Sequence, residues 1–125
     1  MITSEQTRAV EAPHLSHDAL GRLRRLLMAE KAAQAAQLAQ HRAVARELRD
    51  LNDADSVLER ELAEVGAARA EEAVADTELA LQRLDASTYG RCEACGARIP
   101  FERLEAIPAA RLCVACQGRR RPWRR

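Results

Sequence analysis

The chain has 125 residues, of which 2% are aromatic, and much of its 47% hydrophobic content is alanine. That composition argues against a large globular core and favours one small domain or a domain with an appendage. The formal net charge is only +1. No apolar run approaches the roughly 20 residues needed to cross a bilayer, and no signal peptide is visible, so we expect a cytoplasmic protein.

The first part of the chain predicts a flexible segment followed by a long helix. We expect residues 1–15 to be flexible, because they are polar and contain Pro13. Ser16 is a suitable N-cap and Asp18 would lie in the first helical turn. From there to about Arg49 the chain is rich in good helix formers. Its apolar stripe is thin, so the helix needs a partner helix.

Residues 50–56 break this periodicity with residues typical of turns, and Asp55 or Ser56 would cap a second helix that runs to about Ala86. A short turn between two long helices predicts an antiparallel coiled-coil hairpin over residues 16–86, with its tip at about residues 50–56. The apolar face of the second helix is predicted to contain Leu58, Leu62, Val65, Val74, Leu81 and Leu84.

Charge supports the pairing of these two helices. Residues 16–49 carry a net +4 and residues 50–86 a net −8, so side-by-side packing brings opposite charges together. Gly66 is predicted to be a weak point of the second helix, costing about 1 kcal/mol relative to alanine. We expect His41 to have a structural role at the hairpin interface.

All four cysteines lie in the next segment, as two Cys-x-x-Cys pairs: Cys92 with Cys95, and Cys113 with Cys116. Residues 87–118 are therefore predicted to form a four-cysteine zinc finger. Two such turns can complete a tetrahedron of sulfur around one ion, which favours a structural zinc with no open position. Iron in the same site, a redox pair and two disulfides remain alternatives.

Short helices are expected at residues 101–106 and from Val114 onward, and residues 119–125 form a basic tail that contains Trp123. An arginine-rich tail with one aromatic residue is a weak signal for nucleic-acid binding. We expect His14 and His17 to be exposed and without function, since four cysteines already complete the metal site. The sequence contains no nucleophile–base pair and no glycine-rich phosphate loop, so we expect no enzyme.

A helical hairpin comes first in this chain, then Tyr89-Gly90-x-Cys92-x-x-Cys95-Gly96, and then Arg103-Leu104-Glu105-Ala106-x-Pro108 before the second cysteine pair. This order of motifs resembles the DksA/TraR family. This resemblance implies a mainly α fold and a monomeric bacterial transcription factor that binds RNA polymerase. Such proteins insert the hairpin into the secondary channel of the enzyme and act on open promoter complexes, often together with ppGpp.

The resemblance also implies functional residues in the hairpin. The acidic tip of the family would correspond to Asp50 and Asp53, with Asp55 where a small residue is expected; the alternative is a plain solvated turn. Arg69 would retain one contact on the ppGpp side. Asp76 and Gln117 stand where lysines are expected, which makes dependence on ppGpp doubtful.

The main hypothesis is therefore a zinc-containing regulator of RNA polymerase that acts through its acidic tip. The alternative is a nucleic-acid-binding zinc ribbon that uses its basic C-terminal end. In a third hypothesis, the protein occupies the polymerase channel but its tip has no chemical role, so that it acts only as a competitor for the channel. The direction of regulation and the target promoters do not follow from the residues.

Overall fold

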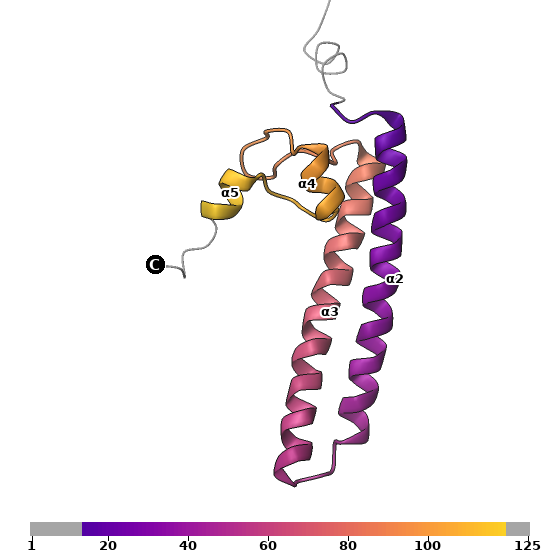
Figure 1. Ribbon diagram of the computed structural model, residues 1–125, viewed down its shortest axis with the longest axis vertical. Coiled ribbons are helices and arrows are strands. Elements are labelled where there is room, and N and C mark those ends of the chain that lie inside the picture. The colour runs from indigo at the N-terminus through magenta and orange to yellow at the C-terminus, as the bar shows by residue number, and fades with distance from the viewer. Residues whose placement is uncertain (1–13, 120–125) are drawn as a thin grey trace, which may run out of the picture.

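The computed structural model describes residues 14–119, so the expectations for residues 1–13 and for most of the basic tail, Trp123 included, lie outside the described residues. The described part contains the long helices α2 (His17–Glu47) and α3 (Ala54–Ala86) and the short helices α4 (Phe101–Ala106) and α5 (Val114–Arg119). Figure 1 shows α2 and α3 side by side along their length, with α4 and α5 beside one end of the pair. The predicted fold class, a helical hairpin with a small four-cysteine module, is confirmed.

Helix α2 begins as its sequence predicts. The Ser16 hydroxyl accepts a hydrogen bond from the backbone N–H of Ala19 at 3.0 Å, and Asp18 lies in the first turn. The helix then runs for 31 residues, which corresponds to roughly 45 Å.

Helix α3 is capped by Asp53, so the prediction of Asp55 or Ser56 as its cap was wrong. The backbone at Asp53 is extended, and its carboxylate accepts a hydrogen bond from the Ser56 N–H at 3.0 Å. That geometry is preferred by an N-cap carboxylate, which satisfies a donor that the first helical turn leaves unpaired. Asp55 falls instead in the first turn, where the helix dipole favours a negative charge.

The hairpin has two kinds of interface along its length. At the end near the finger, Leu23 and Leu27 of α2 are fully buried together with Ile99 and Leu104 of the finger. Further along, the buried residues of α3 are small: Ala63, Ala70 and Thr77. Ala63, Ala70 and Thr77 are seven residues apart, which is the spacing of a coiled-coil seam.

Three of the predicted interface residues lie elsewhere. Leu58, Leu62 and Val65 are 57%, 63% and 50% exposed. The prediction was wrong for them because α3 turns its small residues toward α2 and thereby brings these three to the outside. Leu81 and Leu84 do pack against the buried core, as predicted.

Gly66 has a packing role instead of being a simple weak point. A Cβ atom at this position would lie 2.6–2.9 Å from atoms of the His41 ring. The absence of a side chain at Gly66 thus makes room for His41, which confirms the expected place of this histidine at the hairpin interface.

Opposite charges face each other across the hairpin, as predicted. The pairs are Arg24–Asp85 at 3.0 Å, Lys31–Glu78 at 3.3 Å and Arg42–Glu71 at 3.2 Å. All six side chains are more than 40% exposed, so each pair contributes at most about 1 kcal/mol. The pairs therefore favour this register of the two helices more than they stabilise it. Within residues 14–119 no helix is both long and apolar enough to cross a membrane.

Candidate metal centre and hairpin tip

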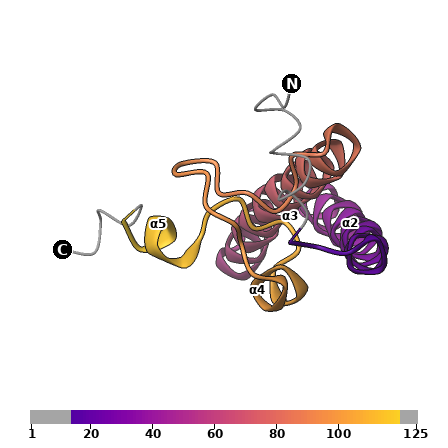
Figure 2. The ribbon, with the colours of Figure 1, turned by 90° about the horizontal axis from the view of Figure 1, so that it is seen from above.

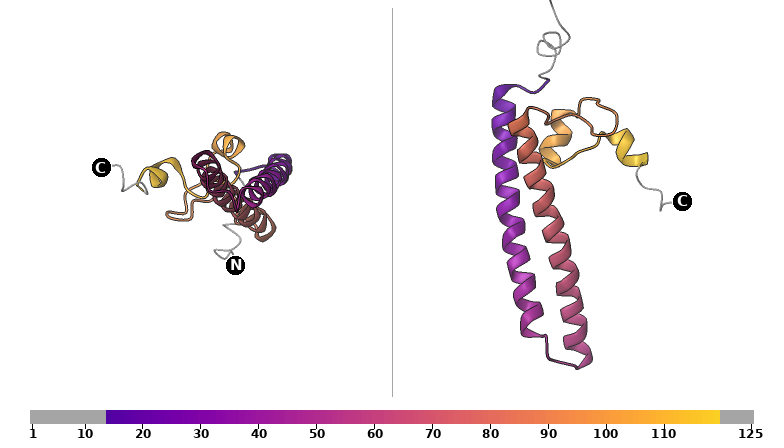
Figure 3. Two further views of the ribbon diagram at one scale, coloured as in Figure 1. Left: turned by 90° about the horizontal axis from the view of Figure 1, so that it is seen from below. Right: turned by 180° about the vertical axis from the view of Figure 1, so that it is seen from behind.

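Two candidate sites lie at opposite ends of the hairpin. The loop between α2 and α3 forms the tip, and the finger with α4 and α5 lies beside the other end, on the side of α3 (Figures 1 and 3). Seen along the hairpin in Figure 2, α5 is held away from the two long helices, and the finger chain connects it to them.

The first cysteine pair lies on a tight loop whose glycines are required. The Gly96 N–H donates to the Cys92 carbonyl at 2.9 Å, and the Cys92 N–H donates to the Ala97 carbonyl at 2.8 Å. Gly96 has a φ of +78° and Gly90 a φ of +91°, a conformation that glycine adopts without a steric penalty. A Cβ atom at Gly90 would also approach the Leu15 side chain to 2.9 Å. These glycines let the chain turn back so that both cysteines face one point.

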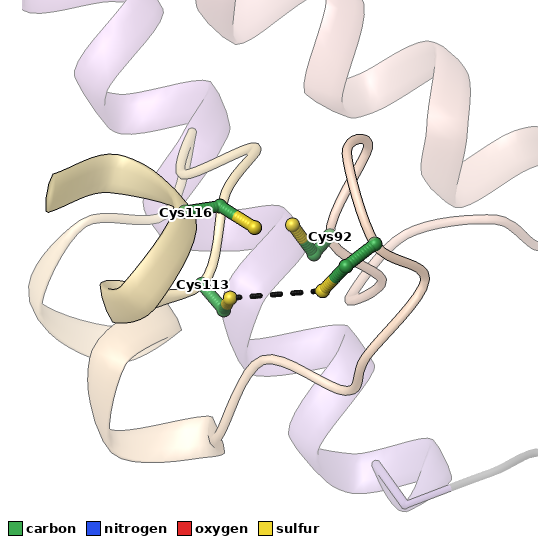
Figure 4. A group of neighbouring side chains, drawn as sticks. Cys92, Cys113 and Cys116 are labelled. Atoms are coloured by element: carbon green, nitrogen blue, oxygen red, sulfur yellow. Dashed lines mark hydrogen bonds between the residues drawn. The ribbon is translucent and has the colours of Figure 1, made fainter. Parts of the chain in front are cut away.

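The second pair is placed by the start of α5. Cys113 precedes this helix and Cys116 lies in its first turn, with the Gln117 N–H donating to the Cys113 carbonyl at 2.8 Å. Figure 4 shows the sulfurs of Cys92, Cys113 and Cys116 pointing into one space between the two loops. Sequence segments that are 21 residues apart therefore meet at this point.

The four sulfurs form one compact cluster. All lie within 4.8 Å of one another, and those of Cys95 and Cys113 are 3.8 Å apart. A tetrahedral zinc site with bonds of about 2.3 Å has sulfur–sulfur edges of about 3.8 Å, whereas a disulfide is about 2.05 Å long. The arrangement thus fits one four-thiolate metal ion and differs from two disulfides.

Backbone donors and burial act on these thiols in opposite ways. The backbone N–H of Cys113, with those of Cys95 and Ala94, lowers the pKa of Cys92 to about 6. Burial raises the pKa of Cys116, although the Arg119 guanidinium donates to its sulfur at 2.9 Å. The thiolate is the form that binds metal, so a bound cation would complete the charge balance of the buried sulfurs.

An ion pair with the hairpin and hydrogen bonds within the finger together set the position of the finger. Glu93, between the first two cysteines, pairs with Arg83 of α3, and its N–H donates to the Arg111 carbonyl at 2.8 Å. The Tyr89 hydroxyl donates to the Pro108 carbonyl at 2.8 Å, and burial raises the pKa of Tyr89. The orientation of the finger therefore depends on α3 as well as on its own sulfurs.

His14 is part of this attachment, which corrects the expectation that it is exposed. Its Nε2 lies 2.9 Å from the Ile99 carbonyl oxygen, and the next residue, Leu15, is only 4% exposed. His14 and Leu15, just before α2, thus lie against the finger. His17 is exposed, as predicted.

The three acidic residues predicted for the tip all lie at the α2–α3 turn. Asp50, Asp53 and Asp55 are exposed. Hydrogen bonds from the hydroxyl and the N–H of Ser56 lower the pKa of Asp53, so this carboxylate is charged at neutral pH. Asp53 therefore both caps α3 and exposes a negative charge at the tip.

Arg60 is a tip residue that the sequence reasoning missed. Its Nη1 donates to the backbone carbonyls of Leu48, Leu51 and Arg49 at 2.7, 3.1 and 3.3 Å. Leu48 is the C-cap of α2, and Arg49 and Leu51 lie in the loop that follows. The second helix thus supplies a cationic donor to backbone carbonyls at and just beyond the end of α2. A basic residue shortly after a tight interhelical turn was the available signal. Arg60 joins the end of α2 to the loop that carries Asp50.

The remaining predicted residues lie on α3 and α5. Arg69 is exposed on α3, whereas Asp76 is half-buried on the same helix. Gln117 is exposed on α5. Of the basic tail, only Arg119 is described, and its guanidinium contacts the Cys116 sulfur.

The sequence of the finger matches a known family of zinc fingers. Residues 87–122 match the family described as the prokaryotic dksA/traR C4-type zinc finger. Two short loops that each present a Cys-x-x-Cys pair to one point are what this description requires. The finger of this chain is therefore similar to the dksA/traR C4-type zinc finger.

Individual relatives match over the same region. General stress protein 16O of Bacillus subtilis is 54% identical over 39 residues, which are 31% of this chain and 24% of that protein. The RNA polymerase-binding transcription factor DksA of Haemophilus influenzae is 45% identical over 40 residues, 32% of this chain and 28% of that protein. The matched part thus spans about a quarter of each of these curated relatives.

The fold as a whole has a solved counterpart. The structure of transcription factor DksA2 from Pseudomonas aeruginosa matches with a TM-score of 0.75 and 23% sequence identity, over 94% of this chain and 95% of that one. The likeness extends beyond the finger to the hairpin. Taken together, the comparisons show a finger that matches the dksA/traR C4-type model and a whole-chain fold like that of DksA2.

Proposed function

We propose that this protein regulates bacterial transcription initiation by inserting its hairpin into the secondary channel of RNA polymerase. The observation that carries the proposal is the tip: exposed carboxylates at the end of a rod roughly 45 Å long, with Asp53 and the Leu48 carbonyl held by defined hydrogen bonds. The finger family and the polymerase-binding relative support the choice of partner. Such a protein would work in the cytoplasm.

The tip would act by charge. Carboxylate oxygens are ligands for hard cations such as magnesium and also attract basic side chains. Asp50 has no side-chain partner within the part of the chain that the structure describes, so it is available for either contact. The protein itself would contribute no catalytic group, in keeping with a regulator instead of an enzyme.

The four cysteines, Cys92, Cys95, Cys113 and Cys116, would hold a structural zinc. Four sulfur ligands fill a tetrahedral site and leave no position for a reactive water. The ion would keep the two finger loops together and thereby maintain the attachment of the finger to α3. We further propose that ppGpp has little influence, because Asp76 and Gln117 leave Arg69 as the one matching basic position.

The first experiment measures binding of the purified protein to bacterial core RNA polymerase in competition with a Gre-type cleavage factor. We expect saturable competition. Absence of binding at micromolar concentrations, together with salt-dependent binding to DNA that is lost on removing residues 119–125, would favour the nucleic-acid-binding zinc ribbon instead.

The role of the tip is tested separately with the Asp50→Asn/Asp53→Asn double variant. Asparagine is as good an N-cap as aspartate, so the substitution removes charge while keeping the start of α3. We expect polymerase binding to stay within about threefold and the effect on open-complex lifetime to disappear. A double variant that regulates fully would rule out tip chemistry, and the protein would then be a channel competitor or act through another contact.

A further inference from the structure

The outer face of α3 carries apolar side chains that no part of the described chain covers. Leu58, Leu62 and Val65 are at least half exposed. Their spacing of four and three residues places them on one stripe, about two turns long. Contiguous exposed apolar patches on soluble proteins mark interaction sites more often than scattered single residues do.

The same face continues toward the finger. Positions 69, 72 and 76 extend the stripe by the same helical spacing, and Asp76 lines a groove of about 190 Å³ together with Ile107. Ile107, at the end of α4, is itself 49% exposed. A partner that lies along α3 would therefore meet apolar groups both near the tip and beside the finger.

The charges around the stripe indicate what the partner must be. Glu59 and Glu61 flank Leu58 and Leu62 and are exposed, and the extension of the stripe carries Arg69, Glu72 and Asp76, so this face has a net negative charge. The acidic residues that pair with α2 (Glu71, Glu78 and Asp85) lie elsewhere on the helix. Two copies of this face would repel each other, whereas a basic surface with apolar recesses would complement it. An apolar helix face with anchors at positions i, i+4 and i+7 is the usual form for docking into such a groove.

We propose that Leu58, Leu62 and Val65 form a docking surface on α3 for a basic, apolar-lined surface of RNA polymerase. This inference rests on the proposed function and adds to it a second contact, distinct from the acidic tip. The tip would then set the effect on the enzyme, and this stripe would supply a large share of the binding free energy.

The test compares a double substitution in the stripe with a single substitution at another exposed position. Leu58→Ser/Leu62→Ser removes the two most prominent side chains of the stripe. Met28→Ser is the matched control, since Met28 is 58% exposed on the other helix. We expect the double variant to bind core RNA polymerase at least tenfold more weakly and the control to bind within twofold of the wild type. Circular dichroism should give each variant the helical content of the wild type, because none of these side chains is buried.

A second variant tests the charge argument. Glu59→Gln/Glu61→Gln should weaken binding about three- to tenfold at low salt and reduce the salt dependence of the affinity. Binding by the Leu58→Ser/Leu62→Ser variant within twofold of the wild type would overturn the inference while leaving the proposed function intact.

Two further outcomes would also overturn it. Failure of the wild-type protein to bind polymerase removes the proposed function and this surface with it. A wild-type dimer in sedimentation that the Leu58→Ser/Leu62→Ser variant dissociates would show that the stripe is occupied by a second copy.

Discussion

The two halves of the hairpin are built from the same two helices but are packed differently. Near the finger, Leu23 and Leu27 are fully buried and share a core with Ile99 and Leu104. Toward the tip, the helices meet through Ala63 and other small residues, and the large apolar side chains of α3 face outward.

The two halves of the hairpin therefore have different roles: one stabilises the fold, and the other exposes side chains to a partner. Burial of large side chains contributes about 1.5–3 kcal/mol each, so most of the folding free energy comes from the finger end. The tip half gains less from packing, and it is held by helix continuity, the exposed Arg42–Glu71 ion pair and the Arg60 hydrogen bonds. It is therefore free to expose acidic and apolar groups to a partner.

The largest effect is expected from removing a metal ligand. Cys92→Ser or Cys113→Ser should abolish stoichiometric zinc binding and unfold the finger, because structural zinc supplies about 10–16 kcal/mol in zinc-finger peptides. Zinc content by mass spectrometry and protease sensitivity after residue 87 would measure this. The hairpin should retain much of its helical circular dichroism. A variant that keeps the finger resistant to protease without metal would contradict the role given to zinc.

The two halves should respond very differently to the same truncation. Leu27→Ala should lower the free energy of unfolding by about 2–5 kcal/mol, as expected for a fully buried leucine. Leu62→Ala, at an exposed position, should change it by less than about 0.5 kcal/mol. Urea denaturation of both variants measures the contrast. Similar losses of unfolding free energy at the two positions would mean that the tip half is packed as tightly as the half near the finger.

Arg60 should matter at the tip alone. Arg60→Ala removes the donor to three carbonyls and should cost about 1.5–3 kcal/mol, the usual range for a hydrogen bond to a charged group. Hydrogen exchange should increase for amides of the tip and remain unchanged at Leu23 and Leu27. Arg60→Lys is the matched control, because it keeps the charge but cannot reach several carbonyls in the same way. Uniform loss of protection along the hairpin would show that Arg60 stabilises the whole coil.

Gly66 and His41 should show a smaller, coupled effect. In an exposed helix Gly→Ala stabilises by about 1 kcal/mol, but here the added Cβ atom meets the His41 ring. Gly66→Ala should give no gain in the wild type and a gain of about 1 kcal/mol in the His41→Ala background. A double-mutant cycle by thermal denaturation measures this coupling. Equal gains in both backgrounds would mean that the ring moves aside at no cost.

Much of the architecture followed from local patterns. The Ser16 cap, the two long helices, the opposite charges of their faces and the short helices of the finger were all predicted, since each depends on residues close together in sequence. The four-cysteine cluster was also predicted, because Cys-x-x-Cys spacing restricts geometry so strongly. The functional roles of Asp50, Asp53 and Asp55 at the tip stay predictions.

The predictions were wrong where the outcome depends on how two segments of the chain pack together. A helical wheel allows Leu58, Leu62 and Val65 to form the inner face of α3, and only the packing against α2 decides that small residues take this place. The loop geometry likewise selected Asp53 over Asp55 as the cap. His14 and Arg60 act on carbonyls that lie far along the chain, or across the turn, from themselves.

By itself, the sequence determined a helical hairpin with an acidic turn and a four-cysteine finger, because periodicity, capping residues and ligand spacing are local properties. Only the tertiary structure decided which face of α3 is buried, how the finger is attached through His14 and Glu93, and how Arg60 holds the tip. The reason is physical: these contacts depend on the relative placement of two helices, and that placement is chosen by the sum of many small packing terms that no single stretch of sequence contains.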